Sequence, residues 1–163
     1  MTDQLIDQIR NSPLAAELSD DECAVLAGLV EKRKLKNGEN LIKEGECEHC
    51  LYVVVSGKLG VTRNVCGGSG CEDITLHVLS AGHFAGEMGF VDGMEHTASL
   101  QSLGKSEVLA LDRQALESQL EAHPHLVYQV MRSIIRSGHD IVRRMNSQYV
   151  ELTNYITKSH GRY

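Results

Sequence analysis

The sequence predicts a mainly β fold, a jelly-roll-like β-roll with flanking helices and a long C-terminal helix. From about residue 32 to about residue 112, short apolar or alternating runs are separated by turn-forming pairs such as Asn37-Gly38 and Ser56-Gly57. About eight strands at this spacing favour a closed roll or sandwich, because an open sheet of short strands would leave many exposed edges. After about residue 125 the apolar residues instead recur at steps of three and four, which is typical of a helix.

Residues 3–30 are predicted to be helical. Within them, Ser19-Asp-Asp-Glu22 has the pattern of a capping box, in which the serine and glutamate side chains each accept a hydrogen bond from the other residue's backbone. The helix that follows places four apolar residues on one face: Cys23, Leu26, Ala27 and Val30. We expect this face to pack on the core.

A second helical region begins after Asp112. Residues 113–122 are predicted to form a short helix that His123-Pro124 ends, because the residue before a proline disfavours the helical conformation. We therefore assign residues 1–124 to the β-roll with its N-terminal helices and this short helix. Residues 125–163 are assigned to a long C-terminal dimerisation helix of the same domain.

The long helix carries a heptad seam. Its positions are Met131, Ile134, Gly138, Ile141, Met145, Gln148, Leu152 and Tyr155. A second set recurs every seven residues beside it, at Ile135, Val142, Tyr149 and Ile156. Two apolar flanks predict that the helix lies on its own roll and also on the same helix of a second subunit, as an isologous homodimer. The alternative is burial within one subunit, but about 35 residues span about 50 Å, which exceeds the core of a small domain. Gly138 on the seam is a candidate pivot.

Composition and charge limit the possible functions. The 163 residues suffice for one domain, and 16 Lys and Arg against 22 Asp and Glu give a net charge of −6. This charge argues against sequence-independent binding to nucleic acid or to an anionic membrane. No apolar run is long enough to cross a bilayer, and the polar, acidic start differs from a signal peptide, so a cytoplasmic protein is expected. The absence of a Ser-His-Asp context, a phosphate loop with lysine and a carboxylate pair predicts that the chain is not an enzyme.

The cysteines allow more than one interpretation. There are five, Cys23, Cys47, Cys50, Cys66 and Cys71. An odd number in a reducing compartment predicts free thiols rather than a disulfide framework. Cys47-Glu-His-Cys50 together with the Cys66/Cys71 pair could alternatively bind a metal, although unrelated thiols in two hairpins are favoured and a metal is not expected. Cys23 is predicted to be a core residue.

Two stretches resemble one known family. They are "KNGENLIKEGECEHCLYVVVSGKLGVTRN" and "HFAGEMGFVDGMEHTASL". Together and in this order they resemble the cyclic-nucleotide-binding domain of catabolite-activator-type regulators, protein kinase A regulatory subunits and cyclic-nucleotide-gated channels. The resemblance covers nearly the whole chain. It implies that Gly45 and Gly57 are turn glycines of the roll, and that the second stretch is the phosphate-binding cassette.

The cassette supplies the candidate ligand-binding residues. Gly86 and Glu87 begin a short helical turn whose free backbone N–H groups could bind an anion. In the family, a glutamate at the position of Glu87 hydrogen-bonds the ribose 2′-hydroxyl. Counting from Pro124 without gaps puts the family's base-contacting positions on the long helix. The predicted ligand-binding set is Gly86, Glu87, Met88, His96, Thr97, Ala98, Ile141 and Val142, and the implied ligand is cyclic AMP or cyclic GMP.

His96 stands where the family's kinase-type spacing has an arginine. A guanidinium is always charged and can bind phosphate with two parallel hydrogen bonds. An imidazole has an ordinary pKa of about 6.5, so it provides that charge only when it is protonated. Three possibilities remain open: a working pocket with weakened or pH-dependent affinity, a pocket for another anion, and a cassette that no longer binds a ligand.

These observations predict a regulatory domain that binds a cyclic nucleotide and transmits occupancy through the dimerisation helix, with a possible protein partner. The alternatives are a dimerisation or docking module without nucleotide, and a cysteine-based metal or redox sensor. A haem ligand at His77 or His139 has no support from spacing. Transcription factors of the family carry a helix-turn-helix after the long helix, but this sequence stops at Tyr163. We therefore expect no direct DNA binding by this chain, which would be a stand-alone module or a fragment of a longer regulator.

Overall fold

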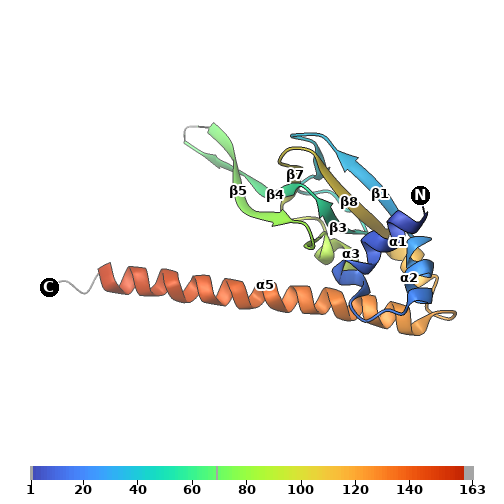
Figure 1. The fold of residues 1–163 in the computed structure, drawn as a ribbon. Helices are drawn as coiled ribbons and strands as arrows, with labels where there is room; N and C mark the ends of the chain where they lie inside the picture. Colours follow the sequence, from blue (N-terminus) through green and yellow to red (C-terminus); the bar gives the residue numbers. More distant parts are fainter. Residues whose placement is uncertain (1, 69, 160–163) are drawn as a thin grey trace.

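The computed structural model describes residues 2–68 and 70–159, which form a β-roll with helices at one end and beneath it (Figure 1). Two four-stranded sheets have the orders β1-β8-β3-β6 and β2-β7-β4-β5, and all their strand pairs are antiparallel. The strands are β1 (Val30–Leu35), β2 (Asn40–Ile42), β3 (Cys50–Ser56), β4 (Lys58–Gly67), β5 (Gly70–Ser80), β6 (Phe84–Ala85), β7 (Ser99–Ser102) and β8 (Ser106–Asp112). The predicted mainly β fold with flanking helices is confirmed.

Helices precede, interrupt and follow the strands. They are α1 (Thr2–Arg10), the 3₁₀ helix η1 (Pro13–Ala15), α2 (Asp20–Ala27), α3 (Glu87–Asp92), α4 (Arg113–Glu117) and α5 (Pro124–Ser159). The predicted capping box is present at the start of α2. Ser19 Oγ accepts from the Glu22 backbone N–H at 3.3 Å, and Glu22 Oε2 accepts from the Ser19 N–H at 2.8 Å.

Two predicted helix boundaries are wrong. The helical face was expected to include Val30, but α2 ends at Ala27 with Gly28 as its cap, and Val30 begins β1 opposite Leu111. The helix expected over 113–122 ends at Glu117. Leu116 is buried there, whereas Leu120 is 55% exposed, so nothing apolar covers the next turn and the chain continues as turns.

The central strand β3 is buried on both faces, which explains its nearly continuous apolar sequence. Side chains alternate between the two faces of a strand. Leu51 and Val53 therefore join a cluster with the surrounding helices. Tyr52 and Val54 point the other way, into a second cluster between the two sheets. β3 thus connects the helical layer to the interior of the roll.

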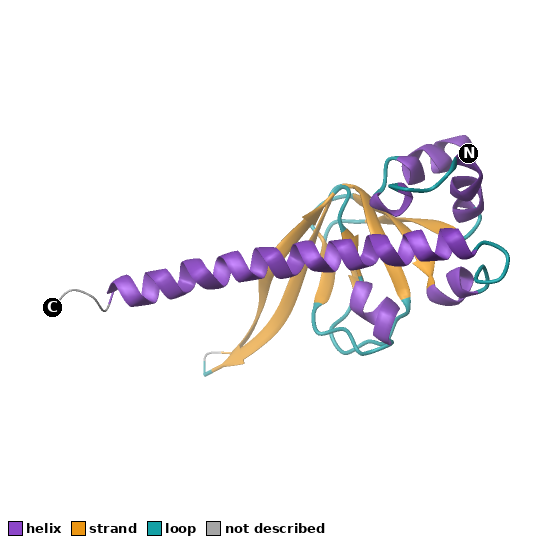
Figure 2. Ribbon diagram, turned by 90° about the horizontal axis from the view of Figure 1, so that it is seen from below, coloured by secondary structure: helices purple, strands orange, loops and turns teal. Residues whose placement is uncertain are grey.

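The long helix α5 is buried at its beginning and exposed at its end. Leu126, Val130 and Ile134 are at most 5% exposed and belong to the cluster beside β3. The remainder of the helix crosses the sheets and projects beyond them (Figure 2). α5 continues as regular helix through Gly138, and a Cβ added there would meet no atom within 4 Å among the described residues. A bend at the candidate pivot is therefore not part of this conformation.

Gly57 is required by the turn between β3 and β4. Its φ is +81°, and an added Cβ would lie 2.4 Å from the backbone oxygen of Lys105. We expect Gly57→Ala to lower the free energy of unfolding by about 3 kcal/mol or more, since backbone strain and steric overlap add. Gly45→Ala is the matched control, because Gly45 has φ +84° and no atom within 4 Å of an added Cβ. Its cost should be only about 1 to 2 kcal/mol. Equal urea midpoints for the two variants would contradict the steric argument.

Candidate ligand-binding site

A cavity of about 1010 Å³ lies between α3, the chain that follows it, β5 and α5. This is the upper end of the usual range for small-molecule pockets. The predicted residues that line it are Gly86, Glu87, Met88, His96, Thr97, Ala98 and Ile141. Val142 is not among the lining residues and is 52% exposed, because one helical step turns it away from its neighbour Ile141. A smaller cavity of about 390 Å³ beside α1 and β3 contains none of the cassette residues.

Gly86 places the start of α3 at the cavity. It has φ +78°, and an added Cβ would lie 2.8 Å from the backbone oxygen of Cys50. Only a residue without a Cβ fits this close approach without strain. The first helical hydrogen bond of α3 runs from the Phe90 N–H to the Gly86 carbonyl at 3.0 Å. The N–H groups of residues 87–89 therefore have no acceptor within the helix, as expected for the first turn.

Glu87 is joined to α5 across the cavity. Its Oε1 accepts a hydrogen bond of 2.9 Å from Ser137 Oγ. Ser137 also lines the cavity, one helical turn before Ile141. Sequence reasoning did not select Ser137, although its position one turn before a predicted contact residue was a usable signal. The bond connects the cassette directly to the long helix.

His96 is held against α3. Its backbone N–H donates to Glu46 O at 2.9 Å, and its carbonyl accepts from the Gly45 N–H at 2.8 Å. The imidazole occupies the space that a side chain at residue 89 would need, since a Cβ on Gly89 would lie 2.6 Å from His96 Cε1. His96 Nε2 is buried and has no hydrogen-bond partner among the described residues. His96 therefore lines the cavity as a residue, while its unsatisfied Nε2 is buried beside Gly89 of α3.

His77 on β5 contributes a second such atom. Its Nε2 is also buried and without a partner in the described part of the chain, and the residue lines the same cavity. Burial lowers the pKa of His77, and the positive charges of Arg144 and His83 lower it further. Sequence reasoning considered His77 only as a haem ligand, because nothing local indicates that β5 faces α5. His139, the other residue considered for haem, is not part of the lining.

The fixed charges of the cavity are mixed. The acidic lining residues are Glu87, Asp92, Glu95 and Asp140, and the permanently basic ones are Arg136 and Arg144. Arg136 is already paired with Glu17, at 2.5 Å between Nη2 and Oε1. This contact lowers the pKa of the Glu17 carboxyl, chiefly through the hydrogen bond from Arg136. Arg144 is therefore the permanent cation of the lining that remains for an anionic ligand, and the imidazoles add positive charge only when they are protonated.

The lowered pKa of His77 predicts a pH effect on the empty protein. Because folding disfavours its protonated form, the unfolded chain binds this proton more readily, and stability falls as the pH drops through about 6.5. We expect the loss of urea stability between pH 7.5 and pH 5.5 to be smaller in His77→Gln. His123→Gln is a control, since His123 lies outside the cavity lining. An unchanged pH profile in His77→Gln would show that this imidazole is protonated equally in both states.

The cysteine prediction is wrong for one pair. Cys66 and Cys71 form a disulfide, with their sulfur atoms 2.06 Å apart. They face each other across the β4–β5 hairpin, a register that brings two thiols together whatever the total number of cysteines. Of the remaining cysteines, Cys23 is buried as predicted, Cys50 is buried and Cys47 is exposed.

The disulfide removes two thiolates from the four-cysteine metal alternative. Among residues 2–68 and 70–159, no three His, Cys, Asp or Glu side chains are grouped so that they could hold a metal ion. Burial raises the pKa of the Cys50 thiol, which disfavours the thiolate that a metal would need.

In the same described ranges, no helix combines the length and hydropathy needed to cross a membrane.

Comparison with known proteins decides the family. The family profile described as "Cyclic nucleotide-binding domain" matches residues 32–123, which is more than half of the 163 residues. The chain belongs to the cyclic nucleotide-binding domain family. The resemblance seen in the sequence is thereby confirmed.

Individual relatives agree with this assignment. The chain is 31% identical over 106 residues to the cyclic AMP receptor protein of Thermus thermophilus, covering 65% of this chain and 48% of that protein. The crystal structure of the Thermus thermophilus catabolite activator protein matches with a TM-score of 0.66 and 28% identity, over 88% of this chain and 63% of that one. A cyclic nucleotide-binding domain from Methylobacillus flagellatus shares the fold, with a TM-score of 0.74 and 21% identity over 94% of this chain and 83% of its own. The chain thus spans about half the length of the first of these relatives.

Proposed function

We propose that this chain is a regulatory domain that binds a cyclic nucleotide, cyclic AMP or cyclic GMP, in the cassette cavity and transmits occupancy through α5. One observation carries the proposal: His77, His96 and Glu87 line the same cavity, and each histidine has a buried imidazole nitrogen without a partner among the described residues. A buried polar atom without a partner costs about 1 to 3 kcal/mol. If the rings turn toward the cavity, a ligand that supplies hydrogen-bond partners to these nitrogens would recover much of this cost. The family match supports a cyclic nucleotide as that ligand.

Because of the charges in the cavity, we expect the affinity for a cyclic nucleotide to depend on pH. The lining has four carboxylates against two guanidinium groups, so a phosphate finds little net attraction while the histidines are neutral. Protonated imidazoles at His77 and His96 would add positive charge and two N–H donors. A bound anion would in turn favour protonation of His77, whose pKa is lowered in the empty protein.

Transmission to α5 can begin at Glu87. Its Oε1 is occupied by Ser137 of α5, whereas in the family this glutamate receives a ribose hydroxyl. A ligand that hydrogen-bonds to this acceptor competes with Ser137. It would therefore favour a position of α5 in which Ser137 no longer contacts the cassette. Such a difference in interaction is what a ligand needs in order to shift a conformational equilibrium.

The exposed end of α5 supports the proposed homodimer. Tyr149, Leu152 and Tyr155 are between 56% and 75% exposed, although they occupy the predicted seam and its flank. An apolar stripe of this length on a helix indicates a partner, and a second copy with the same seam satisfies it symmetrically. The proposal places the two α5 helices side by side, so that a change at Glu87 in one subunit reaches the other.

Calorimetry and thermal shift with cyclic AMP and cyclic GMP test the ligand. A ligand present at a hundred times its dissociation constant stabilises the native state by about 2.7 kcal/mol. Glu87→Gln should weaken binding by about tenfold or more, because the carboxylate acceptor is lost. Glu121→Gln, which lies outside the cavity lining, should bind as the wild type does. No stabilisation by either nucleotide between pH 8 and pH 6 would reject nucleotide binding.

A docking module without nucleotide is the second candidate. The observation that favours it is the hydrogen bond between Ser137 and Glu87, which already satisfies the glutamate in the empty protein. The excess of carboxylates in the lining also opposes an anion. This candidate predicts that α5 still dimerises while no cyclic nucleotide changes the melting temperature. The same thermal-shift experiment, combined with sedimentation, therefore separates the two functions.

A further inference from the structure

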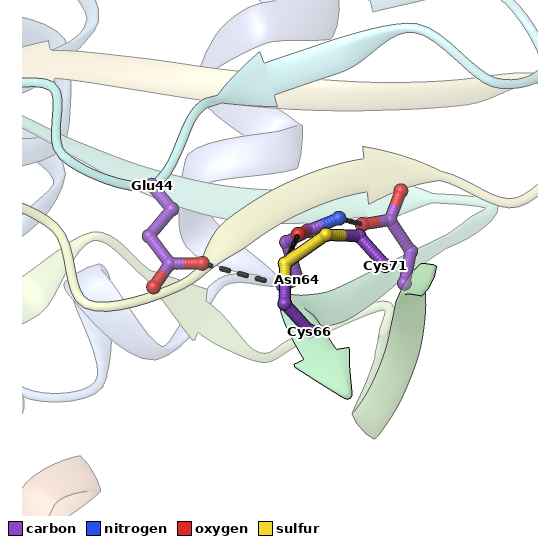
Figure 3. Close-up of a disulfide and its surroundings, with 5 residues drawn as sticks. Glu44, Asn64, Cys66 and Cys71 are labelled. Atoms are coloured by element: carbon purple, nitrogen blue, oxygen red, sulfur yellow. Dashed lines mark hydrogen bonds between the residues drawn. A yellow bond between two sulfur atoms is a disulfide. The ribbon is translucent and has the colours of Figure 1, made fainter. Parts of the chain in front are cut away.

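The disulfide lies at the distal end of the β4–β5 hairpin, where Cys66 and Cys71 face each other with a Cα–Cα distance of 4.0 Å (Figure 3). Both residues are exposed, so a reductant can reach them from solvent. Buried Cys23 and Cys50 differ from them in this respect. Exposed disulfides are the ones most open to thiol–disulfide exchange.

The disulfide cross-links a part of the hairpin that has little other support. β4 pairs with β7 only from Leu59 to Thr62, while its pairing with β5 continues out to Gly67 and Gly70. Beyond Thr62 the hairpin is thus a two-stranded ribbon whose residues are almost all exposed, and its end extends beyond the other strands (Figure 1). An isolated two-stranded hairpin is marginally stable in water. The covalent bond therefore provides much of the order of this ribbon.

Two connections lead from the ribbon to the ligand cavity. The first is β5 itself, since the strand runs from the ribbon to Leu76 and His77, which line the cavity. The second begins at Asn64, whose side chain donates to Asp73 Oδ1 at 2.8 Å and whose backbone N–H donates to Glu44 Oε2 at 3.4 Å. Figure 3 shows Glu44 and Asn64 beside the disulfide.

Glu44 belongs to a turn that is hydrogen-bonded to the cassette. The next residue, Gly45, donates its N–H to the carbonyl of His96 at 2.8 Å, and the His96 N–H donates to Glu46 at 2.9 Å. Arg63 adds an ion pair to Glu44 at 3.3 Å. The ribbon thus contacts the 43–46 turn that holds His96, while β5 carries His77. Two of the three histidines that line the cavity, His77 and His96, are thus connected to the segment that the disulfide orders.

We propose that Cys66–Cys71 is a reversible thiol–disulfide site for dithiol reductants, and that its redox state sets the order of the β5 wall and of the 43–46 turn. One thiolate of the reductant attacks a sulfur of the protein disulfide and forms a mixed disulfide. Its second thiolate then closes the reductant's own disulfide. The protein S–S bond breaks, the reductant is oxidised by two electrons, and its two protons end on Cys66 and Cys71.

Native-state reduction is tested first. Iodoacetamide should label only Cys47 in the oxidised native protein, and Cys47, Cys66 and Cys71 after equilibration with dithiothreitol, since Cys23 and Cys50 are buried. Removal of dithiothreitol in air should restore the single label. A disulfide that dithiothreitol reduces only in denaturant would overturn the proposal. So would thiols at residues 66 and 71 that remain free under every oxidising condition.

Hydrogen exchange tests the transmission without any ligand. Reduction should raise amide exchange by about tenfold or more in the ribbon and in residues 75–78 of β5, with a measurable rise in 43–46 and none in α2. The Cys66→Ser/Cys71→Ser double variant should exchange as the reduced protein does. Cys47→Ser is the matched control, because it removes an exposed thiol outside the hairpin and should leave exchange unchanged. A change confined to residues next to the disulfide would contradict transmission.

Calorimetry with cyclic AMP adds an arm that rests on the proposed function. We expect the reduced protein and the double Ser variant to bind cyclic AMP several-fold more weakly than the oxidised protein, because an ordered wall is pre-organised for the ligand. Equal affinity in both redox states, with clear exchange differences, would overturn the link to the ligand. Absence of binding in both states would reject nucleotide binding, while exchange and alkylation would still decide the redox site.

Discussion

Replacing His96 by arginine is expected to tighten cyclic AMP binding by about tenfold or more at pH 8. A guanidinium keeps its charge at that pH and can donate two parallel hydrogen bonds to the phosphate, each charge-assisted bond being worth about 1.5 to 3 kcal/mol. The effect should be large because the four carboxylates of the lining leave the neutral-histidine cavity without net positive charge. Calorimetry at pH 8, 7 and 6 measures the affinity of both proteins.

The pH dependence of the two proteins should differ. Wild-type affinity is expected to rise from pH 8 to pH 6 as the imidazoles take up protons, whereas the arginine variant should vary less. His96→Gln is the matched control, because its amide donates one hydrogen bond but cannot become charged. It should bind as the wild type does at pH 8 and gain less at pH 6. Equal pH profiles for wild type and His96→Gln would show that His96 does not supply the charge.

The imidazole must leave its present position for this interaction to be strongest. His96 lies where a Cβ on Gly89 would be, and its Nε2 is buried without a partner among the described residues. The ring is therefore placed by packing rather than by a hydrogen bond. A phosphate at the first turn of α3 would offer the oxygen that the ring now lacks, once the ring turns away from Gly89.

The cassette could be predicted from the sequence because its constraints are local. Gly86 has a left-handed backbone immediately before Glu87, and a glycine next to a glutamate is visible in a short motif. The capping box at Ser19 and the turn at Gly57 are predictable for the same reason. The capping box and the positive φ of these glycines depend on residues within a few positions of one another, whereas the close approaches to Cys50 and Lys105 depend on the fold.

The rest of the site depends on elements that are distant in the sequence. Ser137 reaches Glu87 across 50 positions, and the only sequence signal for this contact is its place one helical turn before Ile141. His77 faces the cavity because β5 is at the edge of its sheet and lies beside α5, which is a property of the topology. Of the two positions that the count along the helix selected, Ile141 lines the cavity and Val142 does not.

The disulfide shows a different limit of sequence reasoning. Compartment and cysteine parity predicted free thiols, but pairing depends on strand register. The glycine-rich sequence between Cys66 and Cys71 does indicate a tight hairpin. Their opposite positions in this hairpin allow the disulfide, although the total number of cysteines is odd. Cysteines that flank a predicted hairpin turn are therefore better judged by their cross-strand position than by their number.

The second large effect is expected on assembly. Replacing both Leu152 and Tyr155 by glutamate should weaken the α5 dimer by about a thousandfold or more, because each dimer loses four apolar side chains worth about 1.5 to 3 kcal/mol each. Like charges would also face each other across the seam. Sedimentation equilibrium over a range of protein concentrations measures the change, with a concentration-dependent dimer in the wild type and a monomer in the variant.

The control adds the same charge away from the seam. Ser147→Glu/Asn154→Glu places two glutamates at exposed positions of α5 outside both heptad sets, so its dimer should persist. Both double variants should keep the stability of the roll, because the buried part of α5 ends at Ile134. None of the four positions lines the cavity, so nucleotide binding to the monomer remains measurable. If the two variants sediment alike, the seam does not hold the dimer. A wild type that is monomeric at every concentration would contradict the homodimer, and the exposed face of α5 would then need a different partner.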